Sequence, residues 1–291
     1  MKRGGYEDRF SHPSPVTDRP DTDQARPNES SPFPPDRVAP CLQLHLGRVD
    51  YLAAWELQRL LVRACQAGDL SAALLLVEHP PTYTTGRLGK EKHLLRLPEE
   101  LERLGAVFYR VDRGGDVTFH GPGQLVAYPI LNLRRLGSDI LTFVRGLEEA
   151  VIQTLADFGV SAGRSSGETG VWVGNEKIAA IGVHVSRWVS SHGLALNVST
   201  DLSYFERIVP CGLHGRGVTS LERLLGHAVS ISAVADLLAT ALAQQFELQM
   251  QPFEWRCKGI VLRRCLDREA RLEHEAHERG HEKARKGEGG I

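Results

Sequence analysis

Residues 171–185, Val171-Trp-Val-Gly-Asn-Glu-Lys-Ile-Ala-Ala-Ile-Gly-Val-His-Val185, decide the fold class of this chain. Two runs with the composition of strands, Val171 to Val173 and Lys177 to Val185, flank the turn dipeptide Gly174-Asn175. A tight hairpin joins antiparallel neighbours, whereas a doubly wound fold joins parallel strands through helices. The stretch therefore predicts an α/β domain with a mixed sheet and packed helices, and it argues against a doubly wound parallel sheet.

Helix and strand signals alternate on both sides of this hairpin, without an internal repeat. Strands are expected at residues 73–77, 106–111, 124–131 and 194–198. Two helices have both a start and a stop signal: one is capped by Asp50 and ends at Gly68, and a short one begins at Pro98 and ends at Gly105. Ser138 is expected to cap a third helix, which ends near Gly159. Further on, Thr219 to Glu222 has the pattern of a capping box, and Ser230 is expected to cap a helix from Ala233 to Phe246. We interpret residues 41–265 as one domain.

The two ends of the chain differ in composition from this domain. Residues 1–40 hold eight of the 15 prolines and show no apolar periodicity, which predicts a disordered tail. Residues 266–291 are half charged, which predicts a solvated helix or a disordered segment. We expect neither end to carry the chemistry.

Charge and hydropathy exclude several classes of protein. With 35 basic and 36 acidic residues the formal net charge is −1, so the strong field of a nucleic-acid binder or a membrane-surface protein is missing. The sequence has no apolar run of about 20 residues and no N-terminal secretion signal, so we expect a cytoplasmic protein. Five widely spaced cysteines without a C-x-x-C pair favour neither a disulfide framework nor a zinc site.

The densest polar stretch is Arg113-Gly-Gly-Asp-Val-Thr-Phe-His-Gly-Pro-Gly-Gln124. Its glycines allow the backbone to approach a ligand closely, and Arg113, Thr118, His120 and Gln124 supply hydrogen-bond donors. The stretch lacks the spacing of a Walker loop, and Val126 occupies the third glycine position of a dinucleotide fingerprint. By composition alone, an ordinary glycine-rich turn explains it equally well.

Cys211 and Lys177 are ordinary residues when each is judged alone. Cys211 lies between Pro210 and Gly212, a setting that can present a side chain at a fixed angle, but most lone cysteines are inert small apolar residues. Lys177 begins an otherwise apolar strand, where a solvated hairpin end is the default. If its ammonium lay about 4 Å from a thiolate, the attraction would be about 4 kcal/mol and could lower the thiol pKa by up to about 3 units.

Taken together, these stretches resemble the lipoyl(octanoyl) transferases of lipoate biosynthesis. The resemblance rests on four segments that occur in the family's order and covers roughly residues 41–250. They are Glu78-His-Pro-Pro-Thr-Tyr-Thr-Thr-Gly-Arg87, the glycine-rich stretch from Arg113 to Gln124, Gly170-Val-Trp-Val followed by Lys177-Ile-Ala-Ala-Ile-Gly-Val-His184, and His192-Gly-Leu-Ala-Leu-Asn197 followed by Pro210-Cys-Gly212. Thr85 departs from the family pattern, which usually has leucine there.

The resemblance implies a biotin/lipoate protein-ligase-like catalytic fold, Cys211 as an acyl-thioester nucleophile and Lys177 as the group that lowers its pKa. It also implies octanoyl-acyl carrier protein as donor, with lipoyl domains of 2-oxoacid dehydrogenase complexes and the glycine cleavage H protein as acceptors. No cofactor, metal, nucleic acid or membrane is implied. The acyl-binding residues that it implies are Arg113, Gly114, Gly115, Asp116, Val117, Thr118, Phe119, His120, Ala180, Ile181, Gly182, Gly193, Leu194 and Ala195.

Two other functions remain open at this point. An ATP-dependent lipoate or biotin ligase could use the same fold, because fold does not fix function. A non-catalytic module that binds lipoyl domains or acyl chains is the second alternative. The ligase would need ATP and tolerate loss of Cys211, and the binding module would show no turnover.

Overall fold

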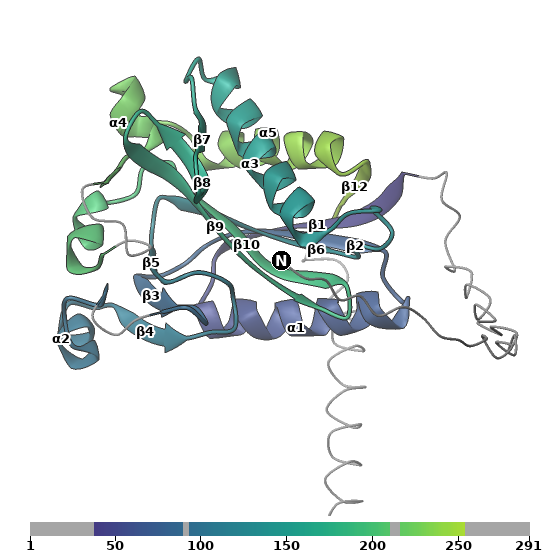
Figure 1. Ribbon diagram of the computed structural model, residues 1–291, viewed down its shortest axis with the longest axis horizontal. Helices are drawn as coiled ribbons and strands as arrows, with labels where there is room; N and C mark the ends of the chain where they lie inside the picture. Colours follow the sequence, from purple (N-terminus) through teal and green to yellow (C-terminus); the bar gives the residue numbers. More distant parts are fainter. Residues whose placement is uncertain (1–37, 90–92, 210–215, 254–291) are drawn as a thin grey trace, which may run out of the picture. The chain divides into compact units, whose positions relative to one another are not determined.

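A large mixed sheet forms the centre of the computed structural model, which describes residues 38–89, 93–209 and 216–253 (Figure 1). Its strand order is β12-β1-β2-β6-β10-β9-β8-β7, and β11 also pairs with β9. β1 is parallel to β2 and β12, whereas β2, β6, β10, β9 and β8 pair antiparallel in turn. The predicted mixed sheet is confirmed. The bounds of the strands are β1 Ala39–Arg48, β2 Ala72–Glu78, β6 Gln124–Leu131, β7 Gly163–Ser165, β8 Glu168–Val173, β9 Glu176–Ser186, β10 Val189–Asn197, β11 Gly217–Val218 and β12 Leu248–Pro252.

The hairpin predicted around Gly174-Asn175 joins β8 to β9, and Gly174 has the positive φ of 58° that such a turn requires. A second hairpin follows directly, because β9 also pairs with β10 through a turn at Arg187 and Trp188, both with positive φ. Successive hairpins place β9 beside β10, and β10 beside β6 at the centre of the sheet.

Helices cover both faces of this sheet, as Figure 1 shows. α1 (Tyr51–Ala67) packs on one face with β2 and β6, and α3 (Ile140–Asp157) and α5 (Ile231–Gln245) pack on the other. The α1 caps are as predicted, since the Asp50 carboxylate accepts from the backbone of Leu52 and Ala53 and Gly68 adopts φ 83°.

Two predicted caps were wrong by one residue. The N-cap of α3 is Asp139, whose carboxylate accepts from Thr142 N at 2.7 Å, because Ser138 instead closes the preceding turn through Leu133 O. Ser220 caps α4 (Leu221–Leu225), because Thr219 is still extended and donates its N–H to Lys177 O. Ser230 caps α5 as predicted.

A second, smaller sheet carries the glycine-rich stretch. It consists of β4 (Val107–Arg110), β3 (Thr82–Thr85) and β5 (Val117–His120), and it packs on α2 (Pro98–Arg103) and the 3₁₀ helix η2 (Leu202–Arg207). The sequence analysis predicted β4 and α2 but not β3 or β5. Both are only four residues long and too short for a clear alternating pattern.

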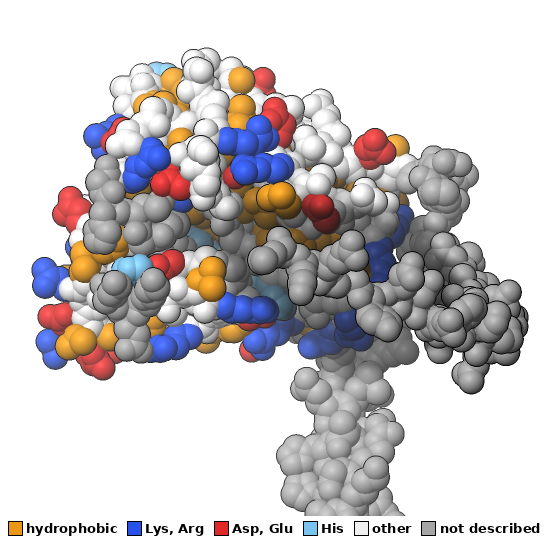
Figure 2. Space-filling view, in the orientation of Figure 1, with side chains coloured by type: hydrophobic (Ala, Val, Ile, Leu, Met, Phe, Trp, Pro, Cys, Tyr) orange, Lys and Arg blue, Asp and Glu red, His pale blue; other side chains and the backbone are white. Residues whose placement is uncertain are grey.

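Two features of the described residues bear on the expected type of protein: the distribution of surface charge and the lengths of the helices. Acidic and basic side chains are interspersed over the face drawn in Figure 2. No helix among the described residues is long and apolar enough to cross a membrane. Residues 1–37 and 266–291 lie outside the described residues, so both tails stay predictions there. The predicted N-terminal tail of residues 1–40 extends too far, because Ala39 and Pro40 already pair with β12 as the first residues of β1.

Candidate active site

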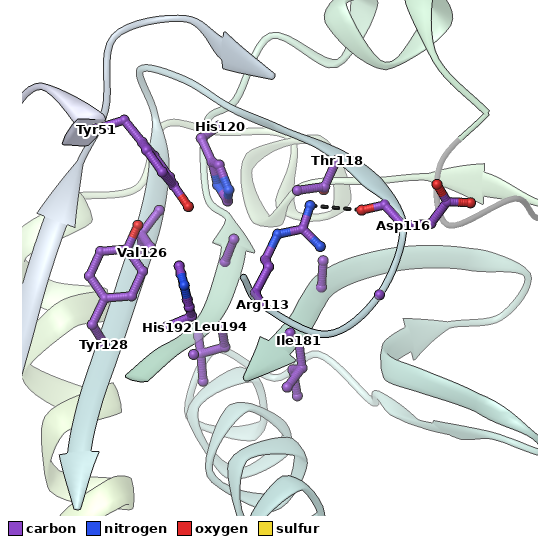
Figure 3. Close-up of a pocket in the computed structure, with 15 residues that line it drawn as sticks. Tyr51, Arg113, Asp116, Thr118, His120, Val126, Tyr128, Ile181, His192 and Leu194 are labelled. Carbon is purple, nitrogen blue, oxygen red and sulfur yellow. Dashed lines mark hydrogen bonds between the residues drawn. The ribbon is translucent and has the colours of Figure 1, made fainter. Parts of the chain in front are cut away.

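A pocket lies where the loop leading into β5 crosses the face of β9 and β10 (Figure 3). It contains about 460 Å³ of empty space, including its open part. The residues of the predicted acyl-binding set that line it are Arg113, Gly115, Asp116, Thr118, His120, Ala180, Ile181, Gly182, Gly193, Leu194 and Ala195. Gly114, Val117 and Phe119 do not line it, and the sequence analysis missed four residues that do: Tyr51, Val126, Tyr128 and His192.

Small residues form the floor of this pocket. Gly193 pairs with Gly182 and Ala195 pairs with Ala180, so four residues with little or no side chain lie in one row across two strands. A Cβ on Gly182 would lie 2.8 Å from Gly114 O, so the covering loop touches the sheet at this point. Beside this contact, the small floor residues leave a narrow slot between the sheet and the loop, with space for a slender chain.

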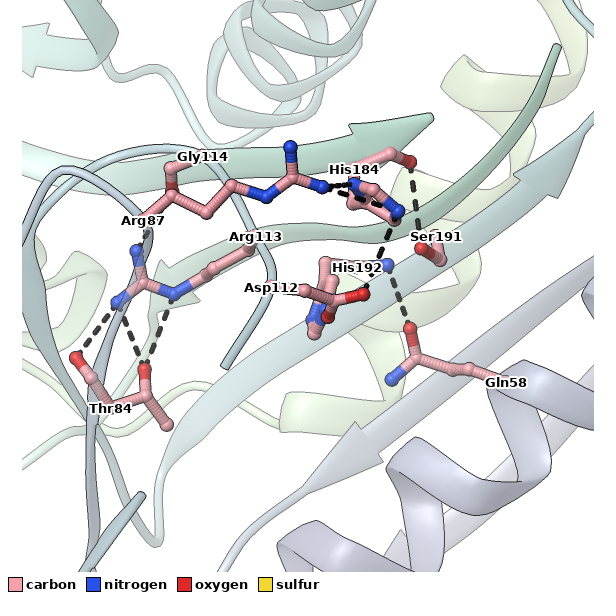
Figure 4. Close-up of polar contacts among 9 residues, drawn as sticks. All are labelled: Gln58, Thr84, Arg87, Asp112, Arg113, Gly114, His184, Ser191 and His192. Carbon is pink, nitrogen blue, oxygen red and sulfur yellow. Dashed lines mark hydrogen bonds and ion pairs between the residues drawn. The ribbon is translucent and has the colours of Figure 1, made fainter. Parts of the chain in front are cut away.

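Arg113 holds the covering loop in shape. Its guanidinium donates to Thr84 O at 2.8 Å, to Asp116 O at 2.7 Å and to Gly114 O at 2.9 Å, and the residue is buried. These bonds tie the loop to itself and to β3 (Figure 4). The Arg113 guanidinium, predicted from the sequence as a donor to a ligand, lines the pocket and also holds the loop closed.

Cys211 belongs to residues 210–215, which lie outside the described residues, but the chain on both sides of them is anchored. On the preceding side Val209 N donates to His93 O at 2.8 Å, and the His93 imidazole pairs with Asp116 of the pocket. On the following side Val218 pairs with Lys177. Both ends of this segment are therefore held at one end of the slot.

Lys177 is buried beside this second anchor. Its ammonium donates to Thr169 O at 3.0 Å and lies 4.7 Å from the centre of the Trp172 ring. It does not line the pocket, since Ala180 is the first residue of β9 that does. Three residues of extended strand place the two Cα atoms roughly 10 Å apart.

A chain of buried polar side chains links the pocket to the same anchor. His120 Nδ1 lies 2.9 Å from Gln124 Oε1, Gln124 Nε2 donates to Asn197 Oδ1, and Asn197 Nδ2 donates to Thr219 O. Since the Gln124 amide nitrogen is already a donor, its oxygen accepts the His120 Nδ1 proton. Burial lowers the pKa of His120 well below its ordinary value, so the ring is neutral and its Nε2 is an acceptor.

Tyr51, Tyr128 and His192 form the opposite end of the slot (Figure 3). The Tyr128 hydroxyl donates to His79 Nε2 at 2.7 Å, because His79 Nδ1 donates to Val49 O. Burial lowers the pKa of His79 to about 4, so it stays neutral near pH 7.

His192 is held by Asp112, whose carboxylate accepts from Nε2 at 2.7 Å (Figure 4). This hydrogen bond lowers the pKa of Asp112 to about 2, and burial lowers the pKa of His192. The signal that could have found His192 was its position directly before Gly193-Leu-Ala195. Tyr51 and Tyr128 carried no such signal, because in sequence they look like ordinary core residues of a helix and a strand.

The described residues contain no group of three or more His, Cys, Asp or Glu side chains placed to hold a metal ion. Cys41 and Cys65 are buried, and burial raises the pKa of each thiol to about 12, so neither of these two is a ready nucleophile.

Comparison with known proteins agrees with this architecture. Residues 50–243 match the model of the lipoyl protein ligase A/B catalytic domain family. Octanoyltransferase of Solibacter usitatus is 52% identical over 212 residues, which cover 73% of this chain and 96% of that protein. Octanoyltransferase of Chloroflexus aggregans is 53% identical over 208 residues, 70% of this chain and 94% of that protein.

Solved structures share the fold at low sequence identity. Lipoate-protein ligase A bound with ATP superposes with a TM-score of 0.61 at 19% identity, over 74% of this chain and 89% of that one. Plasmodium falciparum LipL1 in complex with lipoate gives 0.57 at 11% identity, over 73% and 66%. At these identities the likeness shows the fold alone, and the expected ligase-like catalytic fold is confirmed.

Proposed function

This chain is an acyltransferase that belongs to the octanoyltransferases of the lipoyl protein ligase A/B catalytic domain family, and we propose that it moves octanoyl from octanoyl-acyl carrier protein to a lipoyl-domain lysine. The acceptors would be lipoyl domains of 2-oxoacid dehydrogenase complexes and the glycine cleavage H protein. The reaction would take place in the cytoplasm. Cys211 is the proposed nucleophile and Lys177 its activator.

One observation carries this proposal: a slot with a floor of small residues ends where both flanks of residues 210–215 are anchored. Ala180, Gly182, Gly193 and Ala195 leave a narrow space on the sheet, and an unbranched acyl chain fits such a space. At one end of it, Asp116 and Lys177 hold the chain before and after the segment that contains Cys211. An acyl chain in the slot would thus present its carbonyl to that segment.

In the first proposed step, the Cys211 thiolate attacks the thioester carbonyl of the donor. A new C–S bond forms, the bond to the carrier's sulfur breaks, and the carrier leaves as a thiol after taking a proton. The cationic Lys177 side chain favours the thiolate form of Cys211, because an opposite charge stabilises the ionised group. This is covalent catalysis by an activated thiol.

In the second proposed step, the uncharged amine of the acceptor lysine attacks the enzyme thioester. The C–N bond forms, the C–S bond to Cys211 breaks, and the thiolate is regenerated while the nitrogen loses a proton. An amide results. Because a thioester is already activated, neither step needs ATP.

A transfer assay without ATP tests this function against the ligase alternative. Purified full-length protein is mixed with octanoyl-acyl carrier protein and an isolated lipoyl domain, and the mass of the lipoyl domain is followed. We expect octanoylation of one lysine from the carrier, and none from free octanoate with or without ATP. Modification that requires free acid and ATP would identify a ligase, and no modification at all would indicate a binding module.

A further inference from the structure

His192 lines the slot at the end that lies away from Lys177. On the sheet, His192 pairs with Val183, which follows Lys177 by six residues on β9. The pocket lining on β9 begins at Ala180, three residues before Val183, so at about 3.3 Å per residue the slot runs roughly 10 Å along the strand before it reaches His192. If the carbonyl of a bound acyl chain lies near the Lys177 end, its methyl end points toward His192.

The imidazole of His192 is fixed on several sides. Nε2 donates to Asp112 Oδ1 at 2.7 Å, the backbone N–H donates to Gln58 Oε1 at 2.7 Å, and the Trp55 ring lies 6.0 Å away. The side chain is 2% exposed, and its backbone has a positive φ of 55°, which is costly for a residue other than glycine. Such a group does not move aside easily.

The His192 ring also keeps a fixed tautomer. Because Nε2 donates its proton to the Asp112 carboxylate, Nδ1 of the neutral ring is an acceptor, and it is buried without a hydrogen-bond partner among the described residues. The ring therefore fills the end of the slot as a neutral, planar group.

A surface groove lies behind His192. The groove is lined by Trp55, Arg59, Thr85, Gly86, Arg87, Gly89, Arg110, Val111 and Asp112. Asp112 and Trp55 thus contact His192 from the groove side while His192 lines the slot. The His192–Asp112 pair therefore lies between the slot and the groove.

We propose that the His192–Asp112 pair is the end stop of the acyl slot and sets the upper length of the chain that the enzyme transfers. The proposal rests on the function proposed above and names a specificity-determining pair within the same site. Chains of medium length end before His192. Longer chains would have to displace an imidazole that Asp112 and the backbone of β10 hold in place.

Replacing His192 with alanine tests the proposal. The full-length protein receives octanoyl- and dodecanoyl-acyl carrier protein in equal amounts, and early products on the lipoyl domain are counted by mass. Each further buried methylene favours binding by about fourfold, so H192A should raise the dodecanoyl-to-octanoyl ratio by at least about tenfold. D112A should raise it less, because it frees the ring without removing it.

The matched control is H184A, since His184 also faces Asp112, at 3.6 Å, but does not line the slot. It should keep the wild-type ratio. An unchanged ratio in folded H192A would overturn the proposal, and so would an equal rise in H184A. If H192A does not fold, an unchanged ratio in D112A, whose side chain is 43% exposed and more tolerant of change, overturns it instead.

Failure of the proposed function is a separate outcome. If the wild-type protein gives no octanoylated lipoyl domain, the function is wrong, but the end stop can still be measured. Calorimetric binding of octanoate and dodecanoate to wild type and H192A then replaces the transfer ratio. Stronger binding of dodecanoate only in H192A supports the end stop, and identical preferences in both proteins contradict it.

Discussion

His79 illustrates how burial fixes the charge of single residues in this protein. Its folded-state pKa is about 4, below the ordinary value of about 6.5, so between these values the unfolded chain binds a proton that the folded chain does not. The contribution of neutral His79 to the free energy of unfolding is therefore fully present above about pH 6.5 and is lost as the pH falls toward 4. The shift corresponds to at most about 3 kcal/mol.

We expect urea unfolding of H79Q to show a smaller loss of unfolding free energy between pH 7 and pH 4.5 than the wild type shows. Glutamine can keep the contacts to Val49 and Tyr128 but cannot be charged. The control is H45Q, because His45 is exposed and its replacement should leave the slope unchanged. Equal slopes in H79Q and wild type would contradict the assignment of a neutral buried His79.

Lys177 gives the second prediction at the residue scale. Replacing it with alanine removes the cation proposed to favour the Cys211 thiolate, so the thiol pKa should rise by about 1 to 3 units. The rate of alkylation against pH measures this, in a background where Cys257 and Cys265 are serine. Cys41 and Cys65 do not interfere, because burial raises the pKa of each to about 12. As a control, replacing the exposed cation Arg223 should leave the pH profile of alkylation unchanged. An unchanged profile in K177A would contradict the proposal that Lys177 lowers the pKa of the Cys211 thiol.

Residue identities in the slot could be predicted only in part. The stretch from Arg113 to His120 stands out because glycine and polar residues occur together in it, whereas the short runs at Ala180 and Gly193 were indicated by the family resemblance alone. Tyr51, Val126 and Tyr128 do not stand out, because the apolar pattern of a helix or strand does not tell which core position faces a cavity. The slot arises only when β6, β9, β10 and α1 pack together.

At the scale of elements, Glu148 joins α3 to the strands that hold Lys177. Its carboxylate is fully buried, accepts from Gly170 N at 3.0 Å and pairs with Arg145 and Arg164. Thr169, the neighbour of Gly170, accepts from Lys177. We expect E148A to lower the free energy of unfolding by about 1 to 3 kcal/mol, because the buried Gly170 N–H loses its acceptor, whereas the partly exposed Arg145 and Arg164 can be hydrated.

Glu149 is the matched control for this prediction, because it also pairs with Arg164, at 2.7 Å, but is 36% exposed. E149A should cost at most about 1 kcal/mol. Urea denaturation of both variants measures the difference. Similar losses in E148A and E149A would show that the buried ion pair does not hold α3 to the sheet.

Gly193 tests the close packing of β10 on β6. A Cβ at this position would lie 2.1 Å from Ala127 O and 2.7 Å from Pro129 Cδ, and backbone atoms cannot yield easily. G193A should therefore lower the unfolding free energy by about 3 kcal/mol or more. G163A meets nothing within 4 Å and should be nearly neutral, so thermal melts of the two variants with similar midpoints would contradict the packing described.

Elements with a clear local signal were predicted, including the four-residue β4, but several others were not, among them the ten-residue β1. The hairpin at Gly174-Asn175, the caps Asp50 and Ser230 and the strand 124–131 follow from local chemistry. β3, β5, β7 and β11 have two to four residues each, so pairing with distant partners and not local pattern makes them strands. The same holds for β12, which pairs with β1 from the other end of the domain.

At the scale of the whole molecule, the fold brings distant segments to one site. Residues from α1, β3, the glycine-rich loop, β9 and β10 meet around the slot, although they span positions 51 to 195. A sequence pattern indicates each segment but not their order in a sheet, which long-range pairing decides. The resemblance to a known family indicated that these segments belong to one catalytic fold, and 52% identity to an octanoyltransferase supports that resemblance.

The central claim is that Cys211 carries the acyl group between donor and acceptor, and the mass of the intact protein tests it most directly. Wild type and C211A are each mixed with octanoyl-acyl carrier protein without a lipoyl domain, and their masses are measured. The account predicts one octanoyl adduct on the wild type and none on C211A. No adduct on the wild type, or an equal adduct on C211A, would contradict it.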